Sequence, residues 1–379
     1  MTARPDEQIP APGEHAGEVA RESSGGGPRR RQPGPARRLA RPATALAAVV
    51  VFQMLLASVF LSVLHRPALH HAPVAVVGTS PLAAVVSRHG GGAIRLVPEP
   101  TAQAARAAIR GGQAYAAIVA GRHGESLVIE TAASPGTAAA LTKGFSTAAA
   151  AMKIPLQVRD LAPLPASDPT GVSAFFLIIA EVLGGYVGAT VLGVALGGVR
   201  SPSLRQAAIR LVLLAFYAAV SGSLGALVFG PVIGVAPGYS AALAGVGMLV
   251  VFAAATATAG LQAALGLPGT LLAIIAMVVF GDPTAGTSIA TPLLASPWNV
   301  IGQGLPPGAG LAAARSVLYL DGMNLAGPLT VLATYAAAGT LLMLAAAAWW
   351  PRHHPAPQPP ASRAGTSRSR EVTAPSGAD

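Results

Sequence analysis

Long apolar stretches and shorter mixed segments alternate along the chain. The first apolar stretch, residues 43–64, is roughly 22 residues long and nearly uncharged, and about 20 residues of α-helix cross the hydrocarbon core of a bilayer. Five more follow a mixed region and occupy residues 173–198, 207–234, 239–260, 267–281 and 325–350. This pattern predicts a polytopic α-helical membrane protein with about six spans.

The first apolar stretch allows two interpretations. A cleaved signal peptide would have a shorter apolar region and would begin nearer the start of the chain, whereas this stretch follows a tail of about 40 residues. We therefore favour an uncleaved signal anchor that forms the first transmembrane span.

The stretch 267–281 is the shortest of the six. Its length of about 15 residues falls below the number that a straight crossing requires. The helix is therefore either short and tilted, or it extends back through Ala263 toward the preceding span.

Residues 65–170 differ from the spans, because short β-rich runs separate helical patterns there. Thr101 precedes one of these patterns and can cap the free backbone N–H groups of a helix. We expect a small α/β domain between spans one and two. Its predicted strands are 74–77, 94–97, 115–119, 127–130 and 156–160, and its predicted helices are 81–88, 101–110 and 137–152.

The positive charge indicates the topology. The chain has 25 Lys and Arg residues against 15 Asp and Glu residues, and the arginines gather in the tails and short loops. Loops rich in arginine stay in the cytoplasm, so we place the segment before residue 43 and the loop 199–210 there. The α/β domain and the uncharged connection 235–238 then lie outside. Since topology explains the charge, we expect no nucleic-acid partner.

The two ends of the chain, residues 1–41 and 351–379, are rich in Pro, Ser, Gly and charge and lack apolar periodicity. Segments of this composition bury too little apolar surface to fold. We expect two disordered tails, both cytoplasmic, the first of them basic. The tryptophans Trp349 and Trp350 mark the headgroup level at the end of the last span.

Several chemistries are excluded by the residues present. The chain has no Cys, which rules out disulfides, Cys-ligated metals and thiol nucleophiles. It also lacks a GxxxxGK[ST] loop and the HExxH and GxSxG motifs, so it neither hydrolyses ATP by itself nor shows a familiar hydrolase site. We expect no enzyme activity, no cofactor and no metal, and His65, His70 and His71 are interpreted as solvated. The scattered acids of the α/β region are expected at its surface: Glu99, Glu125, Glu130, Asp160 and Asp168.

Glu181 is the candidate intramembrane polar site. An ionised side chain inside a span costs at least about 2.5 to 3.5 kcal/mol, so such residues usually face a cavity or a partner. The alternative is that Glu181, eight residues after Ser173, lies close enough to the outer face to reach water. Glycines in the same span permit close helix approach, either within one bundle, which we favour, or between two copies: Gly184, Gly188, Gly193 and Gly197.

The segment 282–323 is apolar but is broken repeatedly by Gly and Pro. Irregular backbone at membrane depth must be covered by protein or water, so we predict re-entrant or interfacial half-helices on the external face. An ordinary external loop is the alternative, although loops this long and apolar are uncommon. The residues expected to mark this segment are Asp282, Pro283, Trp298, Pro306, Pro307, Arg315 and Asp321.

The order of these parts resembles the permease subunits of the second class of ABC exporters, in the branch of phage-infection-protein-like membrane proteins. The resemblance rests on an external domain opening near VAVVG and closing with LPASDPTG, and on GDPTAG followed by LPPGAGLAAARSVLYLDG before the last span. It implies a bacterial plasma-membrane protein in contact with lipids, acting as a homodimer or with a related permease. It also implies a separate cytoplasmic ABC ATPase, docked on the loop of Arg200, Arg205 and Arg210 and on the stretch 37–41.

The prolines at 33, 35 and 42 disfavour the amphipathic helix that many relatives carry before the first span. Two functions are compatible with the sequence. One is a permease exporting a hydrophobic, lipid-like or drug-like substrate. The other is a membrane scaffold or secretion-system accessory protein that binds envelope partners through its external domain.

Overall fold

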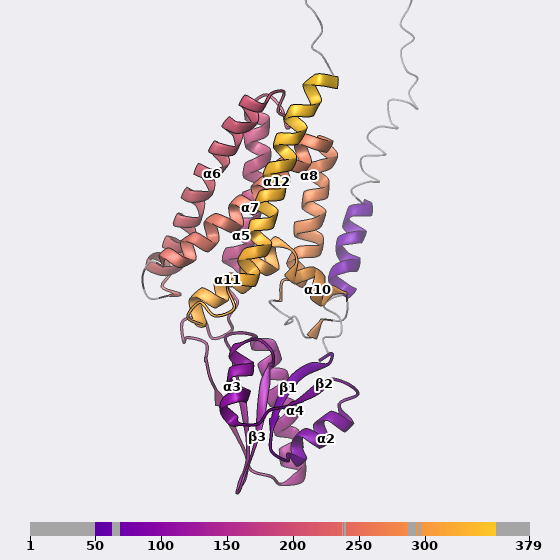
Figure 1. Ribbon diagram of the computed structural model, residues 1–379, viewed down its shortest axis with the longest axis vertical. Helices are drawn as coiled ribbons and strands as arrows, with labels where there is room; N and C mark the ends of the chain where they lie inside the picture. The colour runs from indigo at the N-terminus through magenta and orange to yellow at the C-terminus, as the bar shows by residue number, and fades with distance from the viewer. Residues whose placement is uncertain are drawn as a thin grey trace, which may run out of the picture. The chain divides into compact units, whose positions relative to one another are not determined.

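A computed structural model describes residues 50–62, 69–236, 238, 240–286, 293–294 and 297–353. Within these residues the polypeptide is largely helical, and five helices are long and apolar enough to cross a membrane (Figure 1). The protein is therefore a polytopic helical membrane protein. Residues 1–49, with the predicted N-terminal tail, and residues 63–68 and 354–379 lie outside the described part of the chain. Residues 351–353, predicted as the start of the disordered C-terminal tail, instead continue the last helix.

The five long helices form one bundle. They are α5 (Ser173–Ala195), α6 (Leu204–Leu227) with its π-helical end η1 (Val228–Val232), α7 (Ala241–Leu265), α8 (Leu267–Ile274) with η2 (Ile275–Gly281) and α9 (Asp282–Thr284), and α12 (Ala326–His353). Helix α7 is the core element: 61% of its most apolar window is buried, against 22–39% in the other four. It packs against α5, α6, α8, α11 and α12.

Small residues let the helices approach α7 closely. Gly260 of α7 faces Gly339 of α12, and a Cβ on Gly260 would lie 2.6 Å from the carbonyl oxygen of Gly339. Because lipid gives helices no hydrophobic reason to associate, such close packing is the main source of cohesion in a membrane bundle.

The short fourth apolar stretch continues forward rather than backward. Helix α7 ends at Leu265 and α8 begins at Leu267, with Gly266 at φ 75° between them. That backbone conformation suits glycine, and Pro268 fits the first turn of the new helix. The alternative of an extension back through Ala263 is therefore wrong, and the span reaches Thr284, giving 18 residues.

The Gly/Pro-rich segment before α12 contains two further helices, α10 (Trp298–Gln303) and α11 (Pro306–Tyr319). Pro306 and Pro307 occupy the first turn of α11, where a missing N–H leaves no bond unmade. Most of α11 is buried, and it packs against α5, α7 and α12. Helix α11 is thus covered by protein, whereas Val300 of α10 is exposed. The alternative of an ordinary loop does not describe these two helices.

A five-stranded sheet with three helices precedes the bundle in sequence. The strands are β1 (Ala72–Val77), β2 (Ile94–Pro98), β3 (Ala116–Gly121), β4 (Gly124–Ile129) and β5 (Leu156–Asp160), and the helices are α2 (Pro81–His89), α3 (Ala102–Arg110) and α4 (Pro135–Met152). The sheet order is β2-β1-β3-β4-β5; β3 and β4 pair antiparallel and the other pairs are parallel. Every predicted strand and helix has a counterpart here, with bounds shifted by no more than three residues.

Helices cover both faces of the sheet (Figure 1). Helices α2 and α4 cover one face, where Ile118 and Leu127 pack against Phe145. Helix α3 covers the other, where Ala117 packs with Ile109. The hydroxyl of Thr101 accepts a hydrogen bond of 3.1 Å from the backbone N–H of Ala104, so the predicted cap is present.

The predicted first span is described only at residues 50–62, which form a single apolar helix. This helix is shorter than a full crossing. The span 43–64 therefore stays a prediction.

Candidate functional site in the helical bundle

Glu181 lies on α5 inside the bundle. Its side chain is 5% exposed, and neither carboxylate oxygen has a hydrogen-bond partner among the described residues. About 12 Å of helix separates it from Ser173, at 1.5 Å per residue. The alternative in which Glu181 reaches water or partners near the outer face does not fit this burial.

Two glycines from two other helices make room for this carboxyl group. A Cβ on Gly225 of α6 would lie 2.6 Å from Glu181 Oε1, and a Cβ on Gly247 of α7 would lie 2.9 Å from Glu181 Cδ and closer still to Oε1. Any larger residue would therefore collide with the carboxyl group. We call Glu181, Gly225 and Gly247 the carboxyl cradle. Sequence reasoning found Glu181 but missed both glycines, because only the packing of three helices brings them together.

No cation faces Glu181 within the described bundle. Helix α7 has no titratable residue between Ala241 and Leu265, and α6 has only Arg205, Arg210 and Tyr217. The Tyr217 hydroxyl donates to the carbonyl oxygen of Gly184 at 3.0 Å, so it is already engaged.

The other titratable groups of the packed helices are Tyr186 on α5 and Arg315 and Tyr319 on α11. An ionised carboxylate without a partner is costly in such surroundings. The carboxyl group therefore needs a proton, a cation or water, which are the species that move along transport paths.

Arg210 is also buried, but its bonds are mostly made. The side chain is 1% exposed; Nη1 donates to the Val199 carbonyl at 2.7 Å, and Nη2 donates to the Ala189 carbonyl at 2.8 Å and to Gln262 Oε1 at 2.6 Å. Gln262 in turn donates to the hydroxyl of Thr190 at 2.9 Å. These residues, which we call the arginine anchor, join the α5–α6 loop to α5 and α7.

The anchor corrects one sequence-based expectation. Arg210 was expected to offer its charge to a docked ATPase, but the guanidinium points into the bundle. It can act on docking only through the shape of the loop. Arg205 is exposed and Arg200 is half-buried, so their docking role stays a prediction, and the stretch 37–41 lies outside the described residues.

The glycines of α5 pack inside the bundle. Gly184 and Gly188 lie under the Tyr217 ring, where a Cβ on Gly188 would come within 2.6 Å of a ring carbon, and Gly193 lies against the Arg210 guanidinium. The favoured interpretation, packing within one bundle, is confirmed for these three positions. A copy-to-copy contact is not required to explain them.

Arg315 lies in the C-terminal half of α11, close to Asp168 just before α5. It is 7% exposed, and Nη1 donates to the Gly286 carbonyl at 3.1 Å. Nearby, Asp168 is 2% exposed and accepts hydrogen bonds from the Tyr319 hydroxyl at 2.9 Å and from the Ser173 N–H at 3.3 Å. The hydrogen bond to Asp168 and burial both raise the pKa of Tyr319, with burial the larger cause.

The remaining marker residues of this segment are spread out. Pro283 is buried in α9, Asp282 is half-buried beside it, and Asp321 lies exposed in the turn after α11 at φ 50°. They do not form one site. Their predicted place at a membrane interface stays a prediction.

The expectation that all five scattered acids lie at the surface is wrong for three of them. Glu125, Glu130 and Asp168 are buried. Glu125 accepts hydrogen bonds from the Ser80 hydroxyl and the Leu82 N–H, at the first turn of α2. The hydrogen bonds of Glu125 and Asp168 hold backbone N–H groups and side-chain hydroxyls in place, a role that their spacing in sequence does not reveal.

No cluster of three or more metal-binding side chains occurs among the described residues. Comparison of the chain with protein-family models, with characterised proteins and with solved structures found no match. The functional argument therefore rests on the bundle and its sites.

Proposed function

We propose that this protein is the membrane permease subunit of an ABC-type exporter that moves a hydrophobic, lipid-like or drug-like substrate. The observation that carries the proposal is the carboxyl cradle: a buried carboxyl group without a partner in the core of an apolar bundle. Ionisable residues at such depth typically mark substrate or ion pathways. In a protein with only a structural role, burying a carboxyl group without a partner would lower stability and bring no benefit.

The energy source in this proposal is a separate cytoplasmic ATPase, since the chain has no nucleotide-binding loop. The arginine anchor supports the idea, because it fixes the α5–α6 loop on both sides while Arg205 stays exposed. A fixed loop beside the exposed positive charge of Arg205, at the start of α6, is a suitable platform for an acidic partner surface.

The proposed topology follows from the same loop. With the α5–α6 loop in the cytoplasm, the α/β domain at residues 65–170 lies outside the cell, both tails lie inside, and α10 and α11 lie toward the external face of a bacterial plasma membrane. Protease added to intact cells is expected to cut within residues 65–170 and to spare both tails. Cleavage of the N-terminal tail would reverse this topology.

Affinity purification from native membranes in mild detergent tests the proposal directly. We expect an ABC ATPase to co-purify with the wild-type protein and to be lost from the double variant Arg200→Glu, Arg205→Glu. Arg210 is left unchanged so that the fold of the loop is preserved. The control variant is Arg122→Glu, which alters an exposed charge in the turn between β3 and β4. Recovery of the ATPase with both variants would reject the docking loop.

A second candidate function is a scaffold or secretion-system accessory protein. It is favoured by β5, which is an edge strand of the sheet and is exposed from Gln157 to Asp160. An exposed edge can accept a strand from a partner. Purification that yields envelope proteins and no ATPase, in every variant, would support the scaffold instead.

A further inference from the structure

The guanidinium of Arg315 is buried with two of its three nitrogens unused. Nη1 bonds to the carbonyl of Gly286, whereas Nε and Nη2 have no hydrogen-bond partner among the described residues. Burial lowers the pKa of Arg315 to about 10, so the group is still positively charged at neutral pH. Buried donors of this kind are costly unless something occupies them.

The nearest negative charge does not fill this role. Asp168 influences Arg315 electrostatically, but its carboxylate accepts the hydrogen bonds of Tyr319 and Ser173. The two free donors of Arg315 are also adjacent, because Nε and Nη2 form one edge of the planar guanidinium. This edge matches two oxygens of a carboxylate or phosphate in a bidentate pair.

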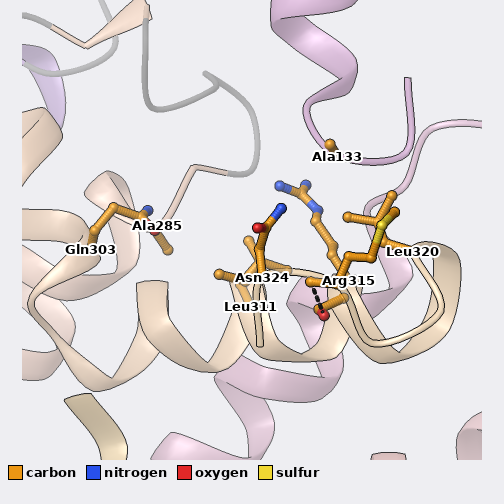
Figure 2. Close-up of a pocket in the computed structure, with 10 residues that line it drawn as sticks. Ala133, Ala285, Gln303, Leu311, Arg315, Leu320 and Asn324 are labelled. Carbon is orange, nitrogen blue, oxygen red and sulfur yellow. Dashed lines mark hydrogen bonds between the residues drawn. The ribbon is translucent and has the colours of Figure 1, made fainter. Parts of the chain in front are cut away.

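A cavity of about 150 Å³ lies at the guanidinium. At about 30 Å³ for each water in the liquid, it would hold about five waters or one compact polar group. Figure 2 shows the Arg315 side chain extending from α11 toward Ala133, with the Asn324 amide beside it. The wall combines polar and apolar groups; it includes Gln303, Leu311, Ser316, Leu320 and Asn324.

We propose that this cavity binds a phosphate group, held by the Nε and Nη2 edge of Arg315. Apolar lining at Leu311 and Leu320 suits a ligand whose charged end is attached to apolar atoms. A phosphate group can come from a lipid headgroup or from a soluble anion. The site does not depend on the exporter proposal, because a scaffold would bind the same group.

The test is the thermal unfolding of the full chain in neutral detergent. One arm adds sodium phosphate against sodium chloride at equal ionic strength, and the other adds phosphatidylglycerol against diacylglycerol at equal mole fraction. We expect a saturable rise in Tm in at least one arm. A rise with phosphate identifies a soluble anion as sufficient, and a rise with phosphatidylglycerol alone identifies a lipid headgroup.

Variants show whether Arg315 is the binding group. Arg315→Gln should abolish the rise, and Arg315→Lys, which keeps the charge without the planar edge, should weaken the apparent affinity at least tenfold. The control Arg122→Gln changes an exposed arginine in the turn between β3 and β4 and should respond as the wild type does. If Arg315→Gln does not fold, the Arg315→Lys titration decides alone. No rise in either arm for the wild type, or an equal rise in the Arg315 variants, would overturn the proposal.

Discussion

The carboxyl cradle and the arginine anchor lie between the same three helices, α5, α6 and α7, yet they differ in how their charges are met. Arg210 has three strong acceptors within 2.8 Å, while Glu181 has none among the described residues. Removing the partners of a buried charge strongly destabilises a fold, and a buried charge that has no partner carries that cost already. The difference is what the exporter proposal requires of a structural anchor and a cradle that takes part in transport.

The largest effect is expected from removal of the anchor. Arg210→Met leaves the acceptors at Val199, Ala189 and Gln262 without their charged donor, and we expect a loss of about 3 to 5 kcal/mol. Thermal unfolding in detergent and the monodisperse fraction on size exclusion measure it. Arg205→Met, an exposed arginine on the same helix, should stay within about 0.5 kcal/mol of the wild type. Equal stability of the two variants would show that the anchor contributes nothing to the free energy of unfolding.

The next effect tests the cradle by filling it. Gly247→Ala places a methyl group against the Glu181 carboxyl group, and we expect a loss of about 1 to 3 kcal/mol from overpacking. Gly245→Ala is the matched control, since nothing lies within 4 Å of a Cβ there.

The pair Glu181→Ala, Gly247→Ala should recover part of the loss, because the smaller side chain removes the collision. A double-mutant cycle on Tm quantifies this coupling. Additive effects would mean that the carboxyl group does not occupy the space between the glycines.

A smaller stability effect is expected from Glu181→Gln. The amide keeps the shape of the side chain and removes its ionisation, so the unfolding free energy should change by less than about 1 kcal/mol. Under the exporter proposal the same variant should lose transport while it still assembles. If Glu181→Gln is as unstable as Arg210→Met, the cradle is structural and the contrast fails.

The smallest effect extends the comparison to the five-stranded sheet and its helices, where Glu130 is buried near Arg110 and Asp160. Burial raises the pKa of Glu130, Arg110 lowers it, and Asp160 adds to the rise. A folded pKa above the unfolded value gives stability that is present at low pH and is lost as pH rises through the folded pKa. Glu130→Gln should therefore gain Tm relative to the wild type between pH 4 and pH 7. A Tm difference that is constant across this range would contradict the raised pKa.

The sheet and the spans were predictable because their patterns are local. Short runs of β-forming residues predicted all five strands, and Thr101 marked the cap of α3. The forward end of the fourth span was missed because the residues of α9, which follow the π-helical part at Gly281, do not continue its apolar run. Hydrophobic periodicity carries no information about such changes in helix type.

The sites were only partly predictable. Glu181 stood out because it is a lone acid in an apolar span, but its cradle and the inward direction of Arg210 depend on contacts 20 to 70 residues apart. Gln262, an amide in the otherwise apolar α7, was the one local hint of a buried polar partner. A sequence pattern predicts which face of a single helix is buried. It does not predict which residues of three different helices come into contact.

The central position of α7 also affects how the protein is made. Helices α5 and α6 are synthesised before α7, and α8, α11 and α12 come after it. Before α7 is synthesised, the Glu181 carboxyl group can contact Gly225 of α6 but not Gly247 of α7. Lipid would then contact the carboxyl group in place of α7, which is energetically unfavourable. We expect helices α5 and α6 to remain at the insertion machinery until α7 has been synthesised. The three helices would then enter the lipid together rather than one by one.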